Sequence, residues 1–186
     1  MLPEYEEYGS WPVSGEIDIM ESRGNDASCE AGGRNAFAST LHWGIDYSQN
    51  QYAKTTQSYT HPTDLSDDFH IYGLEWNENG LFTYIDSPDN VVLQVDASSQ
   101  SFWDLSGYES MGFDNPWRNE NNMAPFNRDF FIIMNVAVGG TNGYFPDGQC
   151  GKTWTEVNGF YDQKDQWYST WNYPETHDSA MQIDWV

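Results

Sequence analysis

Residues 14–25, SGEIDIMESRGN, place three carboxylates in a stretch that otherwise resembles a buried β-strand. Glu16 and Asp18 are two residues apart, so they share one face of a strand, while the isoleucines between and after them face the core. Strict alternation would send Glu21 into the core, where an unpaired carboxylate is costly. One extra residue after Asp18, a β-bulge, would reset the phase. We therefore predict that the three acids line one exposed groove.

A pair of carboxylates suggests glycoside hydrolysis. Retaining hydrolysis uses two carboxyl groups about 5–5.5 Å apart, one as the nucleophile and one as the acid/base. Glu16 and Glu21 would be farther apart along a straight strand, so bending at the bulge must bring their side chains together. Asp18 would raise the proton affinity of both neighbours by like-charge repulsion. Solvated acids at a strand edge and a calcium site are the alternatives, although calcium requires more oxygen ligands and a more loop-like backbone.

Aromatic residues strengthen the carbohydrate interpretation. The 186 residues include 9 Trp, 12 Tyr and 10 Phe. Sugar rings stack their apolar faces on aromatic side chains and present hydroxyls to polar ones. We expect two or three tryptophans to face the groove, with Trp11 the first candidate because it lies five residues before Glu16.

Short β-like runs separated by turn signals predict an all-β domain. Residues 69–86 predict a hairpin with NENG as its turn and Gly80 at positive φ. The run 129–140, DFFIIMNVAVGG, is the most apolar and is predicted to be the most buried strand. Further strands are predicted at 16–22, 36–44, 91–96 and 181–186.

Two long polar segments, 99–128 and 139–176, contain many aromatic residues. Loops this long in a compact domain are usually functional or disordered, and their aromatic content argues against disorder. One short helix is predicted around 158–167.

The net charge of the chain limits which kinds of partner it can bind. The net charge is −22, from 29 acids against 7 Lys and Arg, which argues against binding to nucleic acid or to an anionic membrane. No apolar run is long enough for a membrane span. Cys29 and Cys150 are either one disulfide of a secreted protein or two reduced thiols, and the sequence leaves this open.

Several motifs together resemble one enzyme family. Residues 9–25, GSWPVSGEIDIMESRGN, resemble the active-site motif of glycoside hydrolase family sixteen, and the spacing ExDxxE resembles its laminarinase branch. The resemblance continues in order through STLHWG (39–44), FHIYGLEW (69–76), the run from NPW to FPDG (115–148), KDQWYSTW (164–171) and SAMQIDWV (179–186). The animal members of this branch, which it resembles most, include digestive laminarinases and glucan-recognition proteins.

The resemblance implies a β-jelly-roll, concanavalin-like sandwich with a concave glucan-binding cleft. Residues 1–186 would be a single catalytic domain that lacks N-terminal strands and is incomplete at both termini. It implies a secreted endo-β-1,3-glucanase with a retaining mechanism and no required cofactor. Glu16 would be the nucleophile, Glu21 the acid/base and Asp18 the assisting carboxylate. A non-catalytic glucan-recognition protein, or a structural protein with the same fold, are the alternatives.

The resemblance also implies a substrate-binding wall. Its residues would be Trp11, Arg23, Asn25, His42, Trp43 and Asn135. Asp184 resembles a position that helps to bind a structural calcium ion in some relatives. The exact glucan and the oligomeric state are not predicted.

Overall fold

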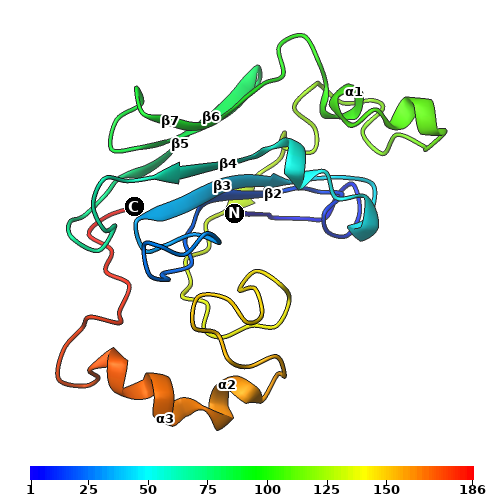
Figure 1. The fold of residues 1–186 in the computed structure, drawn as a ribbon. Helices are drawn as coiled ribbons and strands as arrows, with labels where there is room; N and C mark the ends of the chain where they lie inside the picture. The colour runs from blue at the N-terminus through cyan, green and yellow to red at the C-terminus, as the bar shows by residue number, and fades with distance from the viewer.

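The computed structural model describes residues 1–186 and contains three antiparallel β-sheets (Figure 1). The first sheet has the order β2-β3-β4 and the second β5-β6-β7, while β1 pairs with β8. The strands are β1 (Leu2–Pro3), β2 (Glu16–Glu21), β3 (Ala36–His42), β4 (Thr56–Thr60), β5 (Tyr72–Asn77), β6 (Gly80–Ile85), β7 (Val91–Asp96) and β8 (Phe130–Phe131). The prediction of a domain built mainly from antiparallel strands is confirmed.

The first and second sheets pack face to face around the core. Ile17 and Leu41 of the first sheet are fully buried, and they meet Leu81 and Leu93 of the second in one hydrophobic cluster. Buried residues alternate along β6, as expected for a strand with one face on a core. In this sandwich, one face of β2 packs inward and the other is available for a site.

The hairpin formed by β5 and β6 is confirmed, but the predicted role of Gly80 is wrong. Gly80 pairs with Asn77 and does not have a positive φ. A Cβ at this position would clash with the carbonyl oxygen of Val95 on β7. Glycine is therefore needed for the close approach of a neighbouring strand, not for a left-handed turn.

Segment 99–128 closes one end of the core. Helix α1 (Phe102–Ser106) begins at a capping box between Ser101 and Asp104 and ends at Gly107, and the 3-10 helix η3 (Tyr108–Met111) follows. The segment buries six large side chains, namely Phe102, Trp103, Tyr108, Trp117, Met123 and Phe126. Its aromatic content therefore serves packing, and the prediction of a functional loop is wrong for these side chains.

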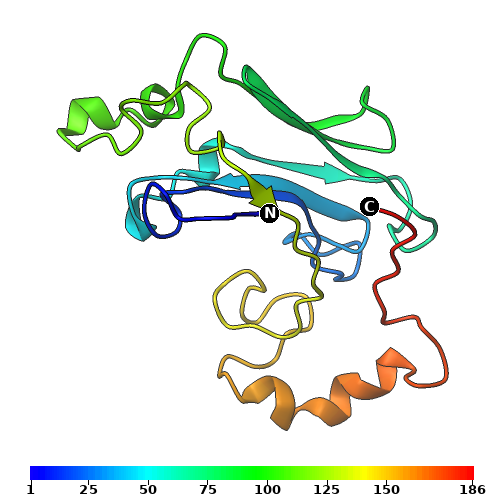
Figure 2. The same ribbon diagram turned by 180° about the vertical axis from the view of Figure 1, so that it is seen from behind.

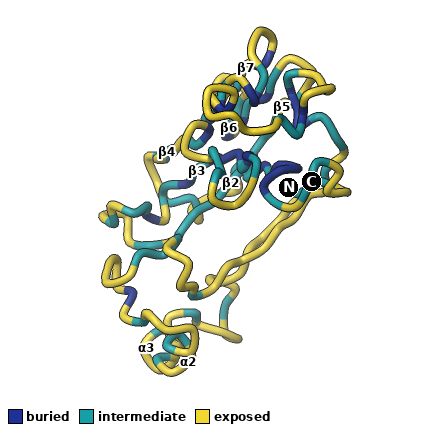
Figure 3. Tube along the Cα trace, turned by 90° about the vertical axis from the view of Figure 1, so that its right-hand side faces the viewer, coloured by how far each residue is buried: buried dark blue, intermediate teal, exposed yellow.

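The predicted burial of segment 129–140 is also wrong. Only Phe130 and Phe131 form a strand, β8, which lies beside β1 near the N-terminus (Figure 2). The apolar side chains that follow are 45–57% exposed, namely Ile132, Ile133, Met134, Val136 and Val138. An apolar strand is buried only when other elements cover its faces, and β1 pairs with the edge of this segment only at Phe130 and Phe131. Residues 181–186, predicted as a strand, are likewise exposed and unpaired (Figure 3).

A disulfide joins two segments that are distant in the sequence. A disulfide links Cys29, in the turn after β2, to Cys150, with 5.6 Å between their Cα atoms. The segment beyond Cys150 carries α2 (Gly159–Asp162) and α3 (Lys164–Trp167), so the predicted short helix is present as two turns. No helix is long and apolar enough to cross a membrane.

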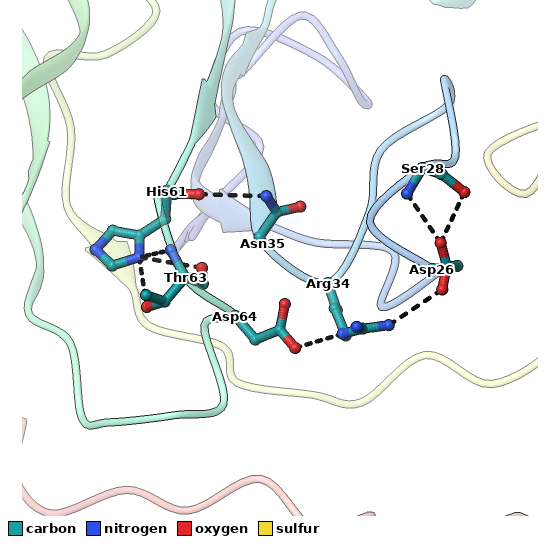
Figure 4. Close-up of polar contacts among 7 residues, drawn as sticks. All are labelled: Asp26, Ser28, Arg34, Asn35, His61, Thr63 and Asp64. Atoms are coloured by element: carbon teal, nitrogen blue, oxygen red, sulfur yellow. Dashed lines mark hydrogen bonds and ion pairs between the residues drawn. The ribbon is translucent and has the colours of Figure 1, made fainter.

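The arginines also join distant segments. Arg34 pairs with both Asp26 and Asp64 (Figure 4). Arg128 pairs with Glu7 and Glu120 in the same manner. Each guanidinium therefore holds two carboxylates from different parts of the chain.

Candidate active site

A β-bulge in β2 brings the three acids onto one face. The strands β2 and β3 pair Glu16 with His42, Asp18 with Thr40 and Glu21 with Ala38. The register shifts between Asp18 and Glu21, where Ile19 and Met20 together oppose one residue of β3. Paired residues lie on the same face of a sheet, and positions 38, 40 and 42 alternate along β3. The bulge predicted from the sequence is confirmed, and the opposite face buries Ile17 against Leu41.

Trp11 lies directly against the first acid. Its indole N–H donates a hydrogen bond of 2.6 Å to Oε2 of Glu16. Its ring centroid is 5.5 Å from that of His42 and 5.6 Å from that of Tyr47. The indole thus fixes the orientation of the Glu16 carboxylate and forms an aromatic wall beside it.

Asp18 faces an oriented histidine. Nε2 of His42 lies 3.3 Å from Oδ2 of Asp18, and Nδ1 of His42 lies 2.8 Å from Nδ2 of Asn50. Oδ1 of Asn50 accepts from the backbone N–H of Tyr52 at 3.1 Å, which fixes which end of the amide faces the histidine. The amide therefore donates to Nδ1, so in the neutral ring the proton sits on Nε2 and points at Asp18.

Burial and like charge perturb the acids. The pKa of Glu16 is raised, first because burial disfavours its charged form and then because Asp18 lies nearby. The pKa of Glu21 is raised for the same two reasons. Burial alone would lower the pKa of His42, but the surrounding carboxylates, with Asp18 foremost, raise it overall. The face therefore favours carboxyl groups that keep a proton closer to neutral pH than usual.

Arg23 and Asn25 lie in the loop after β2 and stabilise neighbouring backbone. The guanidinium of Arg23 donates to the carbonyl of Tyr144 at 2.5 Å and of Ala31 at 2.7 Å, and it lies 4.0 Å from the centre of the Tyr144 ring. The Asn25 amide donates to the carbonyl of Gly32 at 3.0 Å. Both residues line a cavity of about 910 Å³ whose lining also includes Trp154, Phe160 and Trp167.

Two of the predicted wall residues lie elsewhere. Trp43 is fully buried, packs against Phe102 and donates its indole N–H to Thr55 at 2.9 Å. The residue after His42 points to the opposite face of the sheet, so Trp43 belongs to the core and its predicted binding role is wrong. Asn135 is exposed on the unpaired segment after β8. Its predicted role stays a prediction.

Asn50, Tyr47 and Tyr52 contact the site but were not predicted from the sequence. All three belong to the segment that contains the short 3-10 helices η1 (Tyr47–Gln49) and η2 (Tyr52–Lys54). The ring of Tyr52 lies 5.4 Å from that of His42. No motif marks these residues, and the one available signal was a pair of tyrosines soon after HWG.

Comparison with known protein families shows to which family the chain belongs. The model of "Glycosyl hydrolases family 16" matches residues 5–104, which include the three acids, Trp11 and His42. The chain belongs to glycosyl hydrolase family 16. The acid row on β2 is thus part of a family 16 domain, as the sequence resemblance implied.

Relatives of this family 16 chain carry two kinds of name. It is 43% identical over 195 residues to a "Beta-1,3-glucan-binding protein" of Penaeus monodon, an alignment that covers 100% of this chain and 52% of that protein. It is 36% identical over 140 residues to a "Glucan endo-1,3-beta-glucosidase" of Cryptopygus antarcticus, covering 75% and 43% of the two chains. The chain therefore spans about half the length of these relatives or less. Both names refer to a glucan and to the β-1,3 linkage, but one names binding and the other names a glucosidase.

The calcium ion that the family resemblance suggests does not fit the side chains around Asp184. Asp184 is exposed on the unpaired segment 181–186. It belongs to neither of the two groups of three ligating side chains in the structure. Calcium takes six to eight oxygen ligands, so a site at Asp184 stays a prediction that these residues do not support.

Proposed function

We propose that this family 16 domain binds β-1,3-glucan on the face of β2 and β3 that carries the three acids. The main support is the ring of aromatic side chains beside the acids, formed by Trp11, Tyr47 and Tyr52 around His42. Aromatic rings stack on the apolar faces of sugars, while carboxylates accept hydrogen bonds from their hydroxyls. The names of the two relatives described above support β-1,3-glucan as the ligand.

Calorimetric titration of the disulfide-bonded chain with laminarihexaose tests this proposal, with cellohexaose as the control glucan. Trp11→Ala should weaken binding by roughly tenfold, which corresponds to the ~1–1.5 kcal/mol typical of an aromatic contact. Trp185→Ala is the matched control, because Trp185 is 66% exposed on the C-terminal segment. Equal affinities for both variants, or no binding of laminarihexaose, would refute this face of β2 and β3 as the glucan site.

Hydrolysis is the second candidate function. A specific observation favours it: Glu16 and Glu21 share one face and both have raised pKa values. In the retaining mechanism, protonated Glu21 would donate to the glycosidic oxygen while Glu16 attacks the anomeric carbon, and Glu21 would then activate water. The hydrogen bond from Trp11 would hold Glu16 in place, and Asp18 with His42 would tune the proton affinity between the two glutamates.

Release of reducing ends from laminarin separates the two candidates. If the chain is a retaining hydrolase, the first product has the β-anomeric configuration by NMR, and Glu16→Gln and Glu21→Gln each reduce turnover by more than a hundredfold. Glu75→Gln, an exposed residue of β5, should leave turnover unchanged. Binding of laminarihexaose without any release of reducing ends would leave glucan binding as the function and exclude hydrolysis.

The finer family properties are also proposals. A jelly-roll arrangement with a concave cleft is supported by the two packed antiparallel sheets and by family membership. Secretion is supported by the disulfide, which is consistent with an extracellular protein. A structural role without glucan binding is the remaining alternative, and the same titration tests it.

A further inference from the structure

A second group of chemically active side chains lies where the first sheet passes into the second. His61 directly follows β4, His70 precedes β5 and Asp86 directly follows β6. One ligand atom from each of the three residues lies within 4.8 Å of the others. The two imidazole rings meet edge to face, with 4.6 Å between their centroids. The proposed glucan site uses none of these residues.

The His70 side chain has an unused buried nitrogen. Its Nδ1 lies 2.9 Å from Oδ2 of Asp86, whose other oxygen accepts from the backbone N–H of Ile71 at 2.9 Å. The side chain of His70 is only 9% exposed, and its Nε2 is buried without a hydrogen-bond partner. Because Nδ1 donates to the carboxylate, Nε2 carries a lone pair. A buried acceptor without a partner is unfavourable, which indicates a ligand for this atom.

His61 is oriented in a similar way. Its Nδ1 lies 3.1 Å from the carbonyl oxygen of Thr63 and 3.2 Å from both the backbone nitrogen and the hydroxyl of Thr63, so it donates to the carbonyl in one tautomer and accepts from the N–H in the other. Figure 4 shows this nitrogen facing Thr63, with the opposite edge of the ring pointing away from the turn. Hydrogen bonds between His61 and Asn35 fix the backbone at this point. In the tautomer in which Nδ1 donates to the Thr63 carbonyl, Nε2 of His61 also has a free lone pair.

We propose that Nε2 of His61 and Nε2 of His70 bind a divalent transition-metal ion of the zinc type. Metal-binding histidines commonly donate their other N–H to a carboxylate or a backbone carbonyl, which are the partners found here for His70 and His61. Neutral imidazole suits Zn²⁺, Ni²⁺ and Cu²⁺ and does not suit Ca²⁺ or Mg²⁺. Asp86 accepts from Nδ1 on the other side of the His70 ring, so it orients the ring without being a ligand, and water completes the coordination. The ion would tie the first sheet to the second.

Titration with Zn²⁺ alone tests the site and does not depend on glucan binding. Glu16, Asp18 and His42 form the other cluster that could hold a cation, so the titration uses the full chain with His42→Gln as background. In this background, one Zn²⁺ should bind per chain and raise the melting temperature. His61→Gln should weaken binding at least tenfold and abolish the rise. His177→Gln, which removes an exposed histidine, should change neither quantity.

A spectroscopic measurement covers the case in which a variant of buried His70 does not fold. In the ¹⁵N spectrum of the histidine rings, Zn²⁺ should shift the Nε2 resonances of His61 and His70 and leave His177 unchanged. The proposal is overturned if Zn²⁺ does not bind in the His42→Gln background, if His61→Gln binds it normally, or if neither Nε2 resonance moves.

Discussion

At the scale of single residues, the surroundings of Glu21 disfavour the ionised form of its carboxyl group. Burial and the nearby Asp18 both favour its protonated form and raise its pKa. A carboxyl group whose pKa is higher in the folded state stabilises the fold below its unfolded pKa, and this contribution is lost as pH rises through the folded value. At neutral pH, the ionised carboxyl group of Glu21 therefore destabilises the folded domain.

Removing this charge should stabilise the protein. We expect Glu21→Gln to raise the melting temperature at pH 7 by about 1–4 °C, and the difference should disappear near pH 4, where the wild-type carboxyl group is protonated. Differential scanning calorimetry across this range measures both values. Glu78→Gln, which replaces an exposed residue of the turn between β5 and β6, is the control and should leave the melting temperature unchanged. A wild-type protein more stable than Glu21→Gln at pH 7 would contradict the expected sign of the effect.

Two tryptophans separate packing from binding. Trp43 is fully buried, so Trp43→Ala should lower the free energy of unfolding by about 3–5 kcal/mol. Trp11 is partly exposed, so Trp11→Ala should lower it by about 1 kcal/mol or less and act mainly on glucan binding. Urea denaturation measures both. Equal losses of stability would show that Trp11 is a core residue.

The acids of the site were predictable from sequence because a carboxylate inside an apolar strand demands an explanation. The bulge followed from the same argument. The tautomer of His42 was not predictable, since it depends on Asn50 and Tyr52, which lie in a segment without a motif. The side on which Trp43 lies follows from alternation with His42, but resemblance to the family had placed both on the cleft wall.

At the scale of elements, local pairing was predictable and distant pairing was not. The hairpin of β5 and β6 depends on a turn of neighbouring residues, and its strands occur as expected. The burial of segment 129–140 depends on which strands lie beside it, and this information is spread over the whole chain. High hydrophobicity at 132–138 therefore predicted a core strand where the structure has an uncovered segment.

Hydrogen exchange should reveal this difference between elements. No backbone hydrogen bond outside the strands involves residues 132–138, so their amides should exchange close to the unprotected rate. Amides of the central strands β3 and β6 should be protected by a factor of about 10³ or more. Mass spectrometry of peptic fragments compares the two. Strong protection at 132–138 in the isolated chain would show that another surface covers this segment.

At the scale of the whole molecule, the disulfide connects the sandwich to the segment that carries α2 and α3. Cys29 and Cys150 are 121 residues apart in sequence. Helix α3 packs mainly on the turn that follows it, at residues 168–171, and to a lesser extent on α2, and both helices lie at a distance from the two larger sheets (Figure 1). The disulfide also restrains the loop after β2, from which Arg23 contacts Tyr144.

Loss of the disulfide should therefore loosen one part of the molecule. In the double variant Cys29→Ser and Cys150→Ser, we expect proteolysis within residues 140–176 to accelerate roughly tenfold, since the open form of this segment becomes more populated. The β2–β7 sandwich should remain resistant. Limited proteolysis with peptide mapping measures both, and dithiothreitol should reproduce the effect in the wild type only. Unchanged cleavage in the segment would assign its attachment to non-covalent contacts.

Arg34 and Arg128 each pair with two carboxylates, and this arrangement has a consequence for how salt concentration affects the stability of the fold. With 7 basic side chains against 29 acidic ones, even cations that each hold two acids leave most of the negative charge uncompensated. Dissolved sodium or potassium ions must screen that remainder, over a Debye length of about 8 Å at physiological ionic strength. A high salt concentration should therefore stabilise the folded state by reducing repulsion between the acidic side chains, although it weakens the individual ion pairs of the two arginines. Dilution into fresh water would act as a mild denaturant.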